Sequence, residues 1–433
     1  MLPDIEFQIV SRVIIKPSTP TPDDKRSYNI CLTDQFMAPY YIPLILFYRD
    51  GHQKLSRLKE SLSETLTVFY PFAGRLKDNI TVDCNDEGVP FVEAQVNCSL
   101  GDFLEELDAR YLHYFLPCAK VPTEPMREVP AVAIQVTVFS CGGLAIGGCY
   151  NHKIMDAWST GCFIKYWTSN LSGCYDGVVY PDFTAATKVF PPREYIATFQ
   201  AEFLSTPADK KCTFKRYLFD ATSIQALKLK ATSEKVPNPT RVEVVSTFMW
   251  KHAMAKKGKS SYLRHLVNIR KRTVSSIPSG SIGCLVLPAT AAVDLNDEKD
   301  QELDVMVAKV HEAISRVNTE FKNNLDGNNT LEMIWNSMEV NFYDRATVFM
   351  CSSLCQSGAT EFDFGWGKPV WVSPWGDTPS LAEWHSITLV DADGGKGVEA
   401  WFVLQDHEIA ELERDQEFLA YAKPISCILT PST

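Results

Sequence analysis

The chain has 433 residues, of which 45% are hydrophobic and 22% are charged, and its formal net charge is −11. This is the balance of a globular protein, and the length is sufficient for two domains with full cores. An acidic surface disfavours nucleic acid and anionic membranes as partners. We therefore expect neither, and we expect a monomer.

Cysteine usage and the absence of targeting patterns predict a cytoplasmic protein without a metal. The 13 cysteines are an odd number without pairing rhythm, as is typical of reduced thiols. Cys351 and Cys355 form a lone C-x-x-x-C, so no zinc site is expected. The N-terminal residues lack the pattern of a signal peptide, and no apolar run reaches the roughly 18 residues of a membrane span.

The first half of the chain, residues 1–185, alternates strand-like and helix-like patterns and is taken as one domain. Period-two alternation indicates strands, and apolar residues at helical spacing indicate helices. In chain order we expect a strand over 7–15, a helix over 55–67, a turn over 70–75, a strand over 89–96 and strands within 131–150.

A stretch rich in proline and mixed polar residues, 186–212, is expected to form a long crossover. The second half, 213–433, repeats the mixed pattern. Its expected elements are a strand over 213–219, helices over 223–232 and 242–256, a strand over 266–270, a helix over 304–322 and strands within 347–402. The similar rhythm of the halves predicts two related α/β domains with a site between them.

The run His152-Lys-Ile-Met-Asp156 is the first candidate for chemistry. It follows Leu144–Tyr150, which is too apolar and glycine-rich for an exposed element, and it precedes a helix-like stretch. His152 is therefore expected at a strand-to-helix turn, where a rigid scaffold can hold a general base. The alternatives are a solvated helix pair with Asp156 and a hydrogen-bonded core histidine.

The second candidate is Asp363-Phe-Gly-Trp-Gly367. Its aspartate invites a catalytic role. The structural interpretation is favoured, because Gly365 and Gly367 permit a tight turn and Trp366 anchors that turn by burial. We therefore expect a rigid loop here.

Together these motifs resemble those of the plant CoA-dependent acyltransferases of the BAHD family, and the resemblance spans nearly the whole chain. The matching segments, in the family's order, are Leu32–Gln35, Tyr70–Arg75, His152–Asp156, Val267–Arg270, Asp363–Pro369 and Gly397–Trp401. Within the family the chain is most similar to the branch of vinorine synthase, other alkaloid acetyltransferases and fruit alcohol acyltransferases.

The resemblance implies an α/β fold with mixed sheets, in which two chloramphenicol-acetyltransferase-like domains enclose a channel. It implies that acyl-CoA, acetyl-CoA first, enters one mouth as co-substrate and that a small-molecule acceptor enters the other. No bound cofactor is implied. His152 would take the proton of the acceptor in a ternary complex, without an acyl-enzyme.

The resemblance also implies supporting residues. Family aspartates at the Asp156 position usually pair with the arginine of the Asn-x-Arg strand, here Arg270, rather than completing a triad with the histidine. Arg272 is the competing partner. The Asp363–Gly367 loop would lie away from His152 and shape the CoA side.

An acidic chain needs a local basic patch for CoA. The candidates are Thr240 and Arg241, at the start of an expected helix whose N-terminal amides suit phosphates. Helix capping by Thr240 is an equally weighted alternative.

The acceptor side departs from the family pattern. Leu354 stands where the family has tryptophan, and Gln356 stands where shikimate and quinate enzymes place an arginine. A neutral amide cannot form the bidentate ion pair that grips a carboxylate. We therefore expect a neutral hydroxyl acceptor, such as an alkaloid, a terpenoid or a small alcohol.

Two alternatives to O-acyl transfer stay open. The same histidine could serve acyl transfer to an amine. The chain could also be a degenerate relative that binds metabolites without turnover, although the presence of His152, Asp156 and Asp363 argues against this. A thiol-release assay separates these possibilities.

Overall fold

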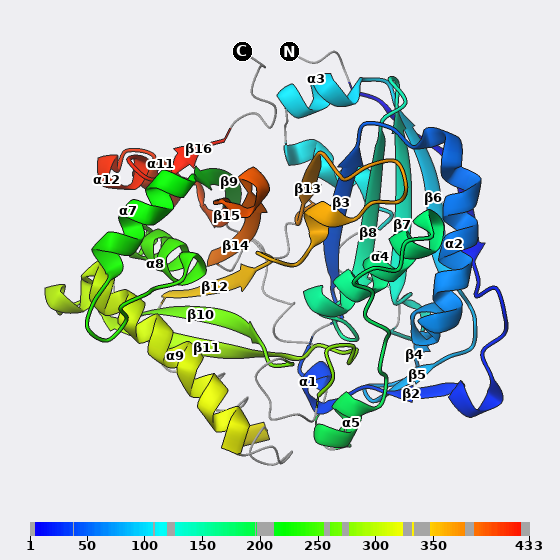
Figure 1. The fold of residues 1–433 in the computed structure, drawn as a ribbon, viewed down its shortest axis with the longest axis horizontal. Helices are drawn as coiled ribbons and strands as arrows, with labels where there is room; N and C mark the ends of the chain where they lie inside the picture. Colours follow the sequence, from blue (N-terminus) through cyan, green and yellow to red (C-terminus); the bar gives the residue numbers. More distant parts are fainter. Residues whose placement is uncertain are drawn as a thin grey trace.

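The computed structural model describes residues 5–37, 39–106, 109–118, 126–194, 196, 212–254, 260–270, 277–323, 331–332, 347–376 and 385–425. They form two lobes that lie side by side, each built around a mixed β-sheet with helices packed on it (Figure 1). The expected α/β fold with mixed sheets is confirmed. Within this described part of the chain, every helix is too short or too polar to cross a membrane.

The N-terminal lobe contains a six-stranded sheet of order β1-β6-β7-β8-β3-β13. Its strands are β1 (Phe7–Ile15), β6 (Val89–Val96), β7 (Val132–Phe139), β8 (Leu144–Asn151), β3 (Tyr41–Tyr48) and β13 (Trp371–Ser373). Neighbouring strands are antiparallel except β6 and β7. A smaller sheet comprises β2 (Ser27–Asn29), β5 (Thr81–Asp83) and β4 (Arg75–Leu76). The described helices of this lobe are α2 (Leu55–Val68), α3 (Leu100–Glu105) and α4 (Ala157–Ser172), whereas α1 (Leu32–Gln35) and α5 (Ala185–Val189) place Leu32 and Ala186 in the apolar cluster of the C-terminal lobe.

Strand β8 is apolar up to Tyr150 and ends in Asn151, and all of its residues are buried because both faces of its sheet are covered. On one face, α2 and α4 pack over an apolar cluster that includes Leu58 and Phe163. On the other face, the 3-10 helix η4 (Ala109–Phe115) brings Phe115 onto the sheet. A Cβ on Gly147 would meet the Phe115 carbonyl oxygen at 1.9 Å, so this close approach requires glycine.

The C-terminal lobe contains a seven-stranded sheet of order β11-β10-β12-β14-β15-β9-β16. Its strands are β11 (Val286–Asp294), β10 (Ser260–Asn268), β12 (Thr347–Ser353), β14 (His385–Ala392), β15 (Gly397–Gln405), β9 (Cys212–Phe219) and β16 (Lys423–Pro424). Strands β10, β12 and β14 are mutually parallel, and the other neighbours are antiparallel. The helices are α7 (Ala221–Ala231), α8 (Arg241–Ala253), α9 (Leu303–Asn323), α11 (Asp406–Leu412) and α12 (Gln416–Leu419).

Most expected elements are present, with shifted ends. The strands expected over 7–15 and 89–96 coincide with β1 and β6, and the helix expected over 304–322 is α9. The strand expected over 266–270 is the end of β10, so Arg270 lies just past that strand. The expected crossover 186–212 begins instead with the short helix α5, where Ala186 and the following Phe190 are buried in the C-terminal core. Residues 195 and 197–211 of this stretch lie outside the described residues.

One strand crosses between the lobes. Strand β13 comes from the second half of the sequence, yet it pairs with β3 at the edge of the N-terminal sheet (Figure 1). Beside it, the guanidinium of Arg216 stands 5.2 Å from the ring centroid of Trp371 and 5.0 Å from that of Trp401. The adjoining aromatic cluster, which includes Phe47, draws residues from both halves. The lobes therefore share part of one core.

Candidate active site

His152 lies between β8 and α4, in the strand-to-helix turn expected from the sequence. Its backbone N–H donates to the Tyr40 carbonyl oxygen at 2.8 Å. The Tyr40 ring stands edge-on to the imidazole, with 5.1 Å between the centroids. His152 is half-buried, whereas Asn151 and Lys153 on either side are buried. The loop thus fixes the backbone while part of His152 remains accessible.

The Nδ1 atom of His152 lies 3.5 Å from the sulfur of Cys284, within hydrogen-bond reach for sulfur. Cys284 is fully buried, and burial raises the pKa of its thiol well above the usual value, with the carboxylates of Asp156 and Asp34 adding to the shift. Because Nδ1 faces the sulfur, proton transfer with a substrate would fall to Nε2.

Asp156 caps the start of α4 and pairs with Arg270. Its Oδ1 accepts from the Ser159 N–H at 2.8 Å, and its Oδ2 accepts from Arg270 Nη1 at 2.6 Å and from the Leu285 N–H at 3.1 Å. Asp156 and Arg270 are only 2% and 3% exposed, so this is a buried ion pair. The competing partner, Arg272, lies outside the described residues.

Arg270 also binds the segment that carries Cys284. Its Nε donates to the Ser281 carbonyl oxygen at 2.8 Å, and its Nη2 donates to the Gly283 carbonyl oxygen at 2.8 Å and to Ser159 Oγ at 3.0 Å. One guanidinium therefore ties the first turn of α4, in the N-terminal lobe, to residues 281–285 of the second half of the chain.

Asp34, in the matched segment Leu32–Gln35, belongs to the same network, which the sequence analysis did not foresee. Its carboxylate accepts the Cys31 N–H at 2.7 Å and the Cys284 N–H. Asp34 is fully buried, and burial raises its pKa to about 6, against the opposing effect of these N–H donors. The only signal in the sequence is its position inside a family segment.

Lys153 is a second residue that the sequence analysis missed, although it stands next to His152. Its ammonium donates to the carbonyl oxygens of Gln35 at 3.2 Å and Met37 at 3.1 Å. The side chain is fully buried, and burial lowers its pKa to about 8, with Asp34 opposing the shift. Lys153 thereby ties the turn that carries His152 to the end of α1.

The Asp363–Gly367 segment is a tight loop, as expected, but its fully buried residue is Phe364, and Trp366 is only partly buried against the same cluster. Asp363 Oδ1 accepts the N–H groups of Gly365, Trp366 and Gly367 at 2.7, 3.1 and 2.9 Å, and both glycines have positive φ. A Cβ on Gly365 would lie 3.6 Å from Ser172, the last residue of α4. Since α4 has 16 residues, it is about 24 Å long. The loop and His152 therefore lie near opposite ends of one helix.

Thr240 and Arg241 have partners within the protein. Thr240 Oγ1 accepts the Glu243 N–H at 3.2 Å, and the Glu243 carboxylate accepts the Thr240 N–H at 2.8 Å, so Thr240 caps α8. The Arg241 guanidinium donates to Asp391 and to the Gly395 carbonyl oxygen. The capping alternative for Thr240 is thus observed, and a phosphate would compete with Asp391 for Arg241.

Gln356 binds the Asp391 carboxylate, whereas the Leu354 N–H donates to the Leu389 carbonyl oxygen at 2.7 Å. Gln356 is exposed, adopts a left-handed backbone with φ of 62°, and donates its N–H to Asp391 Oδ2 at 2.6 Å. Leu354 is partly buried against the aromatic cluster shared by the lobes. The structure therefore brings an acceptor-side candidate and a CoA-side candidate, Arg241, together at Asp391.

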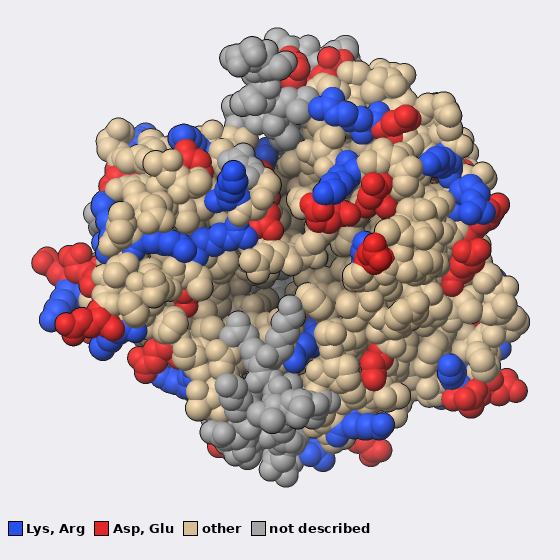
Figure 2. Space-filling model, in the orientation of Figure 1, with Lys and Arg blue, Asp and Glu red and all other residues tan. Residues whose placement is uncertain are grey.

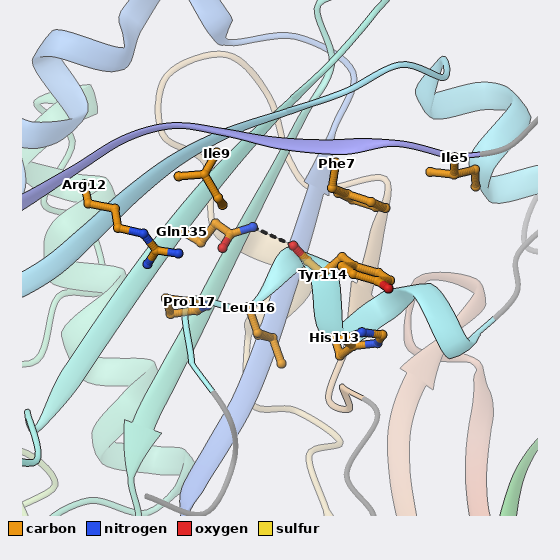
Figure 3. A pocket seen from close by; sticks show the side chains of 9 residues that line it. All are labelled: Ile5, Phe7, Ile9, Arg12, His113, Tyr114, Leu116, Pro117 and Gln135. Atoms are coloured by element: carbon orange, nitrogen blue, oxygen red, sulfur yellow. Dashed lines mark hydrogen bonds between the residues drawn. The ribbon is translucent and has the colours of Figure 1, made fainter. Parts of the chain in front are cut away.

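The face shown in Figure 2 is hollowed between the two lobes. A separate hollow of about 350 Å³ lies on the N-terminal lobe (Figure 3). There the ring of Phe7 of β1 stacks on that of Tyr114 of η4, with 4.8 Å between the ring centroids. The described residues that line this hollow include none from the His152 turn. Among the described residues, no cluster of His, Cys, Asp or Glu side chains is arranged to hold a metal ion.

The chain is similar to known proteins over almost its full length. A model of the Transferase family matches residues 5–419. Akuammiline synthase 2 of Alstonia scholaris is 37% identical, over 97% of this chain and 97% of its own. Limonoid 7-O-acetyltransferase of Citrus sinensis is 34% identical, over 98% of this chain and 100% of its own.

Solved structures show the same extent of likeness. Vinorine synthase superposes with a TM-score of 0.81 at 31% identity, covering 98% of this chain and all of the other. F. graminearum TRI101, complexed with coenzyme A and deoxynivalenol, has a TM-score of 0.66 at 15% identity over 92% of this chain and 99% of its own, which shows a shared fold alone. The chain therefore belongs to the Transferase family of BAHD acyltransferases and has their two-domain chloramphenicol-acetyltransferase-like fold.

Proposed function

We propose that this chain transfers the acyl group of acyl-CoA, acetyl-CoA first, to a neutral hydroxyl group of a plant specialised metabolite. The observation that carries the proposal is the position of His152 in a fixed turn. Its backbone N–H donates to the Tyr40 carbonyl oxygen, and its Nδ1 faces the sulfur of Cys284. The relatives support it, because several are named as O-acetyltransferases of limonoids, stemmadenine or salutaridinol.

The proposed reaction is a direct transfer between two bound substrates. Neutral imidazole has a reference pKa of about 6.5, so at neutral pH His152 can remove the hydroxyl proton at Nε2 as the oxygen attacks the thioester carbonyl. The tetrahedral oxyanion then collapses and the carbon–sulfur bond breaks. CoA leaves as a thiolate and takes the proton back from the imidazolium.

The remaining residues are proposed to position these groups. The Asp156–Arg270 pair fixes the start of α4, and the Asp363–Gly367 loop shapes the CoA side from the far end of that helix. We propose a cytoplasmic monomer of two domains, 1–185 and 213–433, joined by 186–212, with β13 reaching across. Thr240 is proposed to act as a cap rather than as a phosphate ligand.

The acceptor is proposed to be neutral because Gln356 offers no cation to a carboxylate. Gln356 is exposed in the structure, so the penalty arises where the bound acceptor excludes water around it: there a carboxylate without a cation partner costs several kcal/mol, enough to lower kcat/KM by orders of magnitude. An alkaloid alcohol, a terpenoid alcohol or a small alcohol therefore fits better than shikimate or quinate.

The experiment is a thiol-release assay of the purified full-length protein. Acetyl-CoA and malonyl-CoA are each supplied with neutral alkaloid and terpenoid alcohols, the matching amines, shikimate and quinate, and His152→Ala serves as the control. We expect the highest kcat/KM for acetyl-CoA with a neutral alcohol. Turnover of amines alone would indicate N-acyl transfer, and CoA binding without thiol release would indicate a degenerate relative. Equal rates for acidic and neutral acceptors would contradict the proposed acceptor class.

A further inference from the structure

The segment that presents Cys284 to His152 is held at consecutive backbone groups. The Cys284 N–H donates to Asp34, and the Leu285 N–H donates to Asp156 Oδ2 at 3.1 Å. The preceding carbonyl, that of Gly283, accepts from Ser159 Oγ at 2.9 Å as well as from Arg270. Buried groups from both halves of the sequence thus fix the backbone on either side of one cysteine, and its sulfur lies 3.5 Å from the imidazole.

We propose that Cys284 is a positioning residue for His152, whose sulfur accepts the Nδ1–H of the neutral imidazole and thereby keeps Nε2 unprotonated for the acceptor hydroxyl. This inference rests on the proposed general-base function of His152. A neutral imidazole carries one N–H, so a partner that holds the proton on Nδ1 selects the tautomer with a basic Nε2. Sulfur is a weak acceptor, so the effect is smaller than that of a carboxylate in the same place.

The same contact has the geometry of a thiol–imidazole nucleophile, and burial argues against that role. Thioester exchange would form a bond from Sγ to the acyl carbon, break the bond to CoA sulfur and send the thiol proton to Nδ1. Cys284 is 0% exposed, so the acyl carbon has no approach to the sulfur. Burial also raises the pKa of the thiol well above the usual value, which keeps it protonated.

Several titratable groups surround the pair and would enter any pH profile. The carboxylates of Asp34 and Asp156 and the Arg270 guanidinium bind the backbone of 281–285, as described above. The further groups beside Cys284 or the His152 turn are Cys31, Tyr40 and Lys153. A substitution at Cys284 leaves all of these side chains in place, so a changed profile would report on the sulfur itself.

The test compares Cys284→Ala and Cys284→Ser with Cys351→Ala, which also removes a fully buried thiol but lies on β12 within the core of the C-terminal lobe. We expect Cys284→Ala to lower kcat about threefold to tenfold, as for one neutral hydrogen bond, with KM for both substrates within about twofold, and to displace the pH–kcat profile. Cys284→Ser should restore kcat with its own displaced profile. Cys351→Ala should leave kcat, KM and the pH–kcat profile unchanged.

A double-mutant cycle separates this inference from the function on which it rests. In a His152→Ala background, Cys284→Ala should cause no further loss, because Cys284 acts through the imidazole. An undiminished loss there, an unchanged pH profile in Cys284→Ser, or an acyl adduct on Cys284 in acid-quenched wild-type enzyme would each overturn the inference. If His152→Ala itself stays active, the general-base function fails instead. Should Cys284→Ala not fold, the profile of Cys284→Ser decides.

Discussion

His152 stands where the two halves of the sequence meet in one hydrogen-bond network. The first half supplies the imidazole, the Tyr40 carbonyl and Asp156, and the second half supplies Arg270 and Cys284. The polar groups around Asp156 and Cys284 are buried, so removing one partner leaves another without its bond. Substitutions in the network should therefore separate into those that lower kcat without changing stability and those that lower the stability of the fold around His152.

His152→Ala should belong to the first group. Loss of a general base lowers the rate by about 10²–10⁴-fold, while the backbone bond to the Tyr40 carbonyl oxygen is kept. We expect kcat to fall by this factor, with unchanged circular dichroism and unchanged acetyl-CoA affinity by calorimetry. A variant that keeps more than about a tenth of the wild-type kcat would rule out the general-base mechanism.

Asp156→Asn and Arg270→Gln should belong to the second group. Either change leaves one member of a buried pair unpaired, which destabilises a protein by about 3–5 kcal/mol. We expect both variants to unfold at lower urea concentration and to lose activity, and the double variant to lose less than the sum. Purely additive losses would show that the two residues are not coupled and would point to Arg272 as the partner, or to a direct bond between Asp156 and His152.

Lys153 should make stability depend on pH. Burial lowers its pKa to about 8, whereas an exposed lysine titrates near about 10.4. Between these values the unfolded chain holds a proton that the folded chain has lost, so stability rises with pH, by up to about 1.4 kcal/mol per pH unit. At pH values below this range Lys153 is charged in the folded protein, so stability is lowered by the full cost of burying that charge.

Lys153→Met removes this term while keeping a long side chain in the same space. Urea unfolding at about pH 7.5 and about pH 9.5 should show that wild type gains stability relative to the variant at the higher pH. The same pH dependence in both proteins would mean that Lys153 stays charged throughout this range.

At the scale of secondary-structure elements, Asp391 at the end of β14 joins the start of α8 to the turn after β12. Its carboxylate accepts from the Arg241 guanidinium at the start of α8 and from the Gln356 N–H in the turn after β12. The side chains of Arg241 and Asp391 are 18% and 19% exposed. This arrangement favours a structural tie between three elements over an open phosphate site.

Arg241→Gln should therefore lower the urea midpoint and leave KM for acetyl-CoA within about twofold, since the lost bonds are internal. Lys230→Gln is the matched control, because its ion pair with Glu417 is about half exposed on both sides and such pairs contribute little. A large rise in KM at unchanged stability would instead make Arg241 a CoA ligand.

Elements with a long, regular period were predictable, and contacts between distant short segments were not. The alternation of β6 over 89–96 and the helical spacing of α9 follow from single segments. Strand β13 has three residues, too few for a period, and its partner β3 lies far earlier in the chain. At the site, His152, Asp156 and Arg270 have family spacings, whereas Cys284 and Lys153 are single residues whose burial only the fold reveals.

At the scale of the whole molecule, the lobes are joined through β13. Trp371 stacks on Phe47 of β3 with 5.1 Å between the ring centroids, and Arg216 of β9 lies beside the Trp371 ring. The N-terminal sheet is therefore incomplete without a segment from the second half. This pairing and the Asp156–Arg270 ion pair both join the halves that supply the groups around His152.

Residues 1–196 expressed alone should not form a stable monomer. Without β13, the β3 edge and the Phe47 ring are uncovered, and such an edge promotes association. We expect aggregation in size-exclusion chromatography and no cooperative urea transition, whereas the full chain serves as the folded control. Addition of a peptide spanning 362–376 should raise the soluble fraction. A monomeric fragment with a cooperative transition would refute the shared-sheet account.

Strand β13 also has a consequence for the synthesis of the protein. A ribosome adds about 5–20 residues per second, so β13 emerges on the order of tens of seconds after β3. During that interval the nascent first lobe presents an unpaired sheet edge to its surroundings, and neighbouring nascent chains on the same messenger carry the same edge. The rate of translation through the second half of the message, and the chaperones that meet the unfinished chain, should therefore influence how much active enzyme a cell obtains.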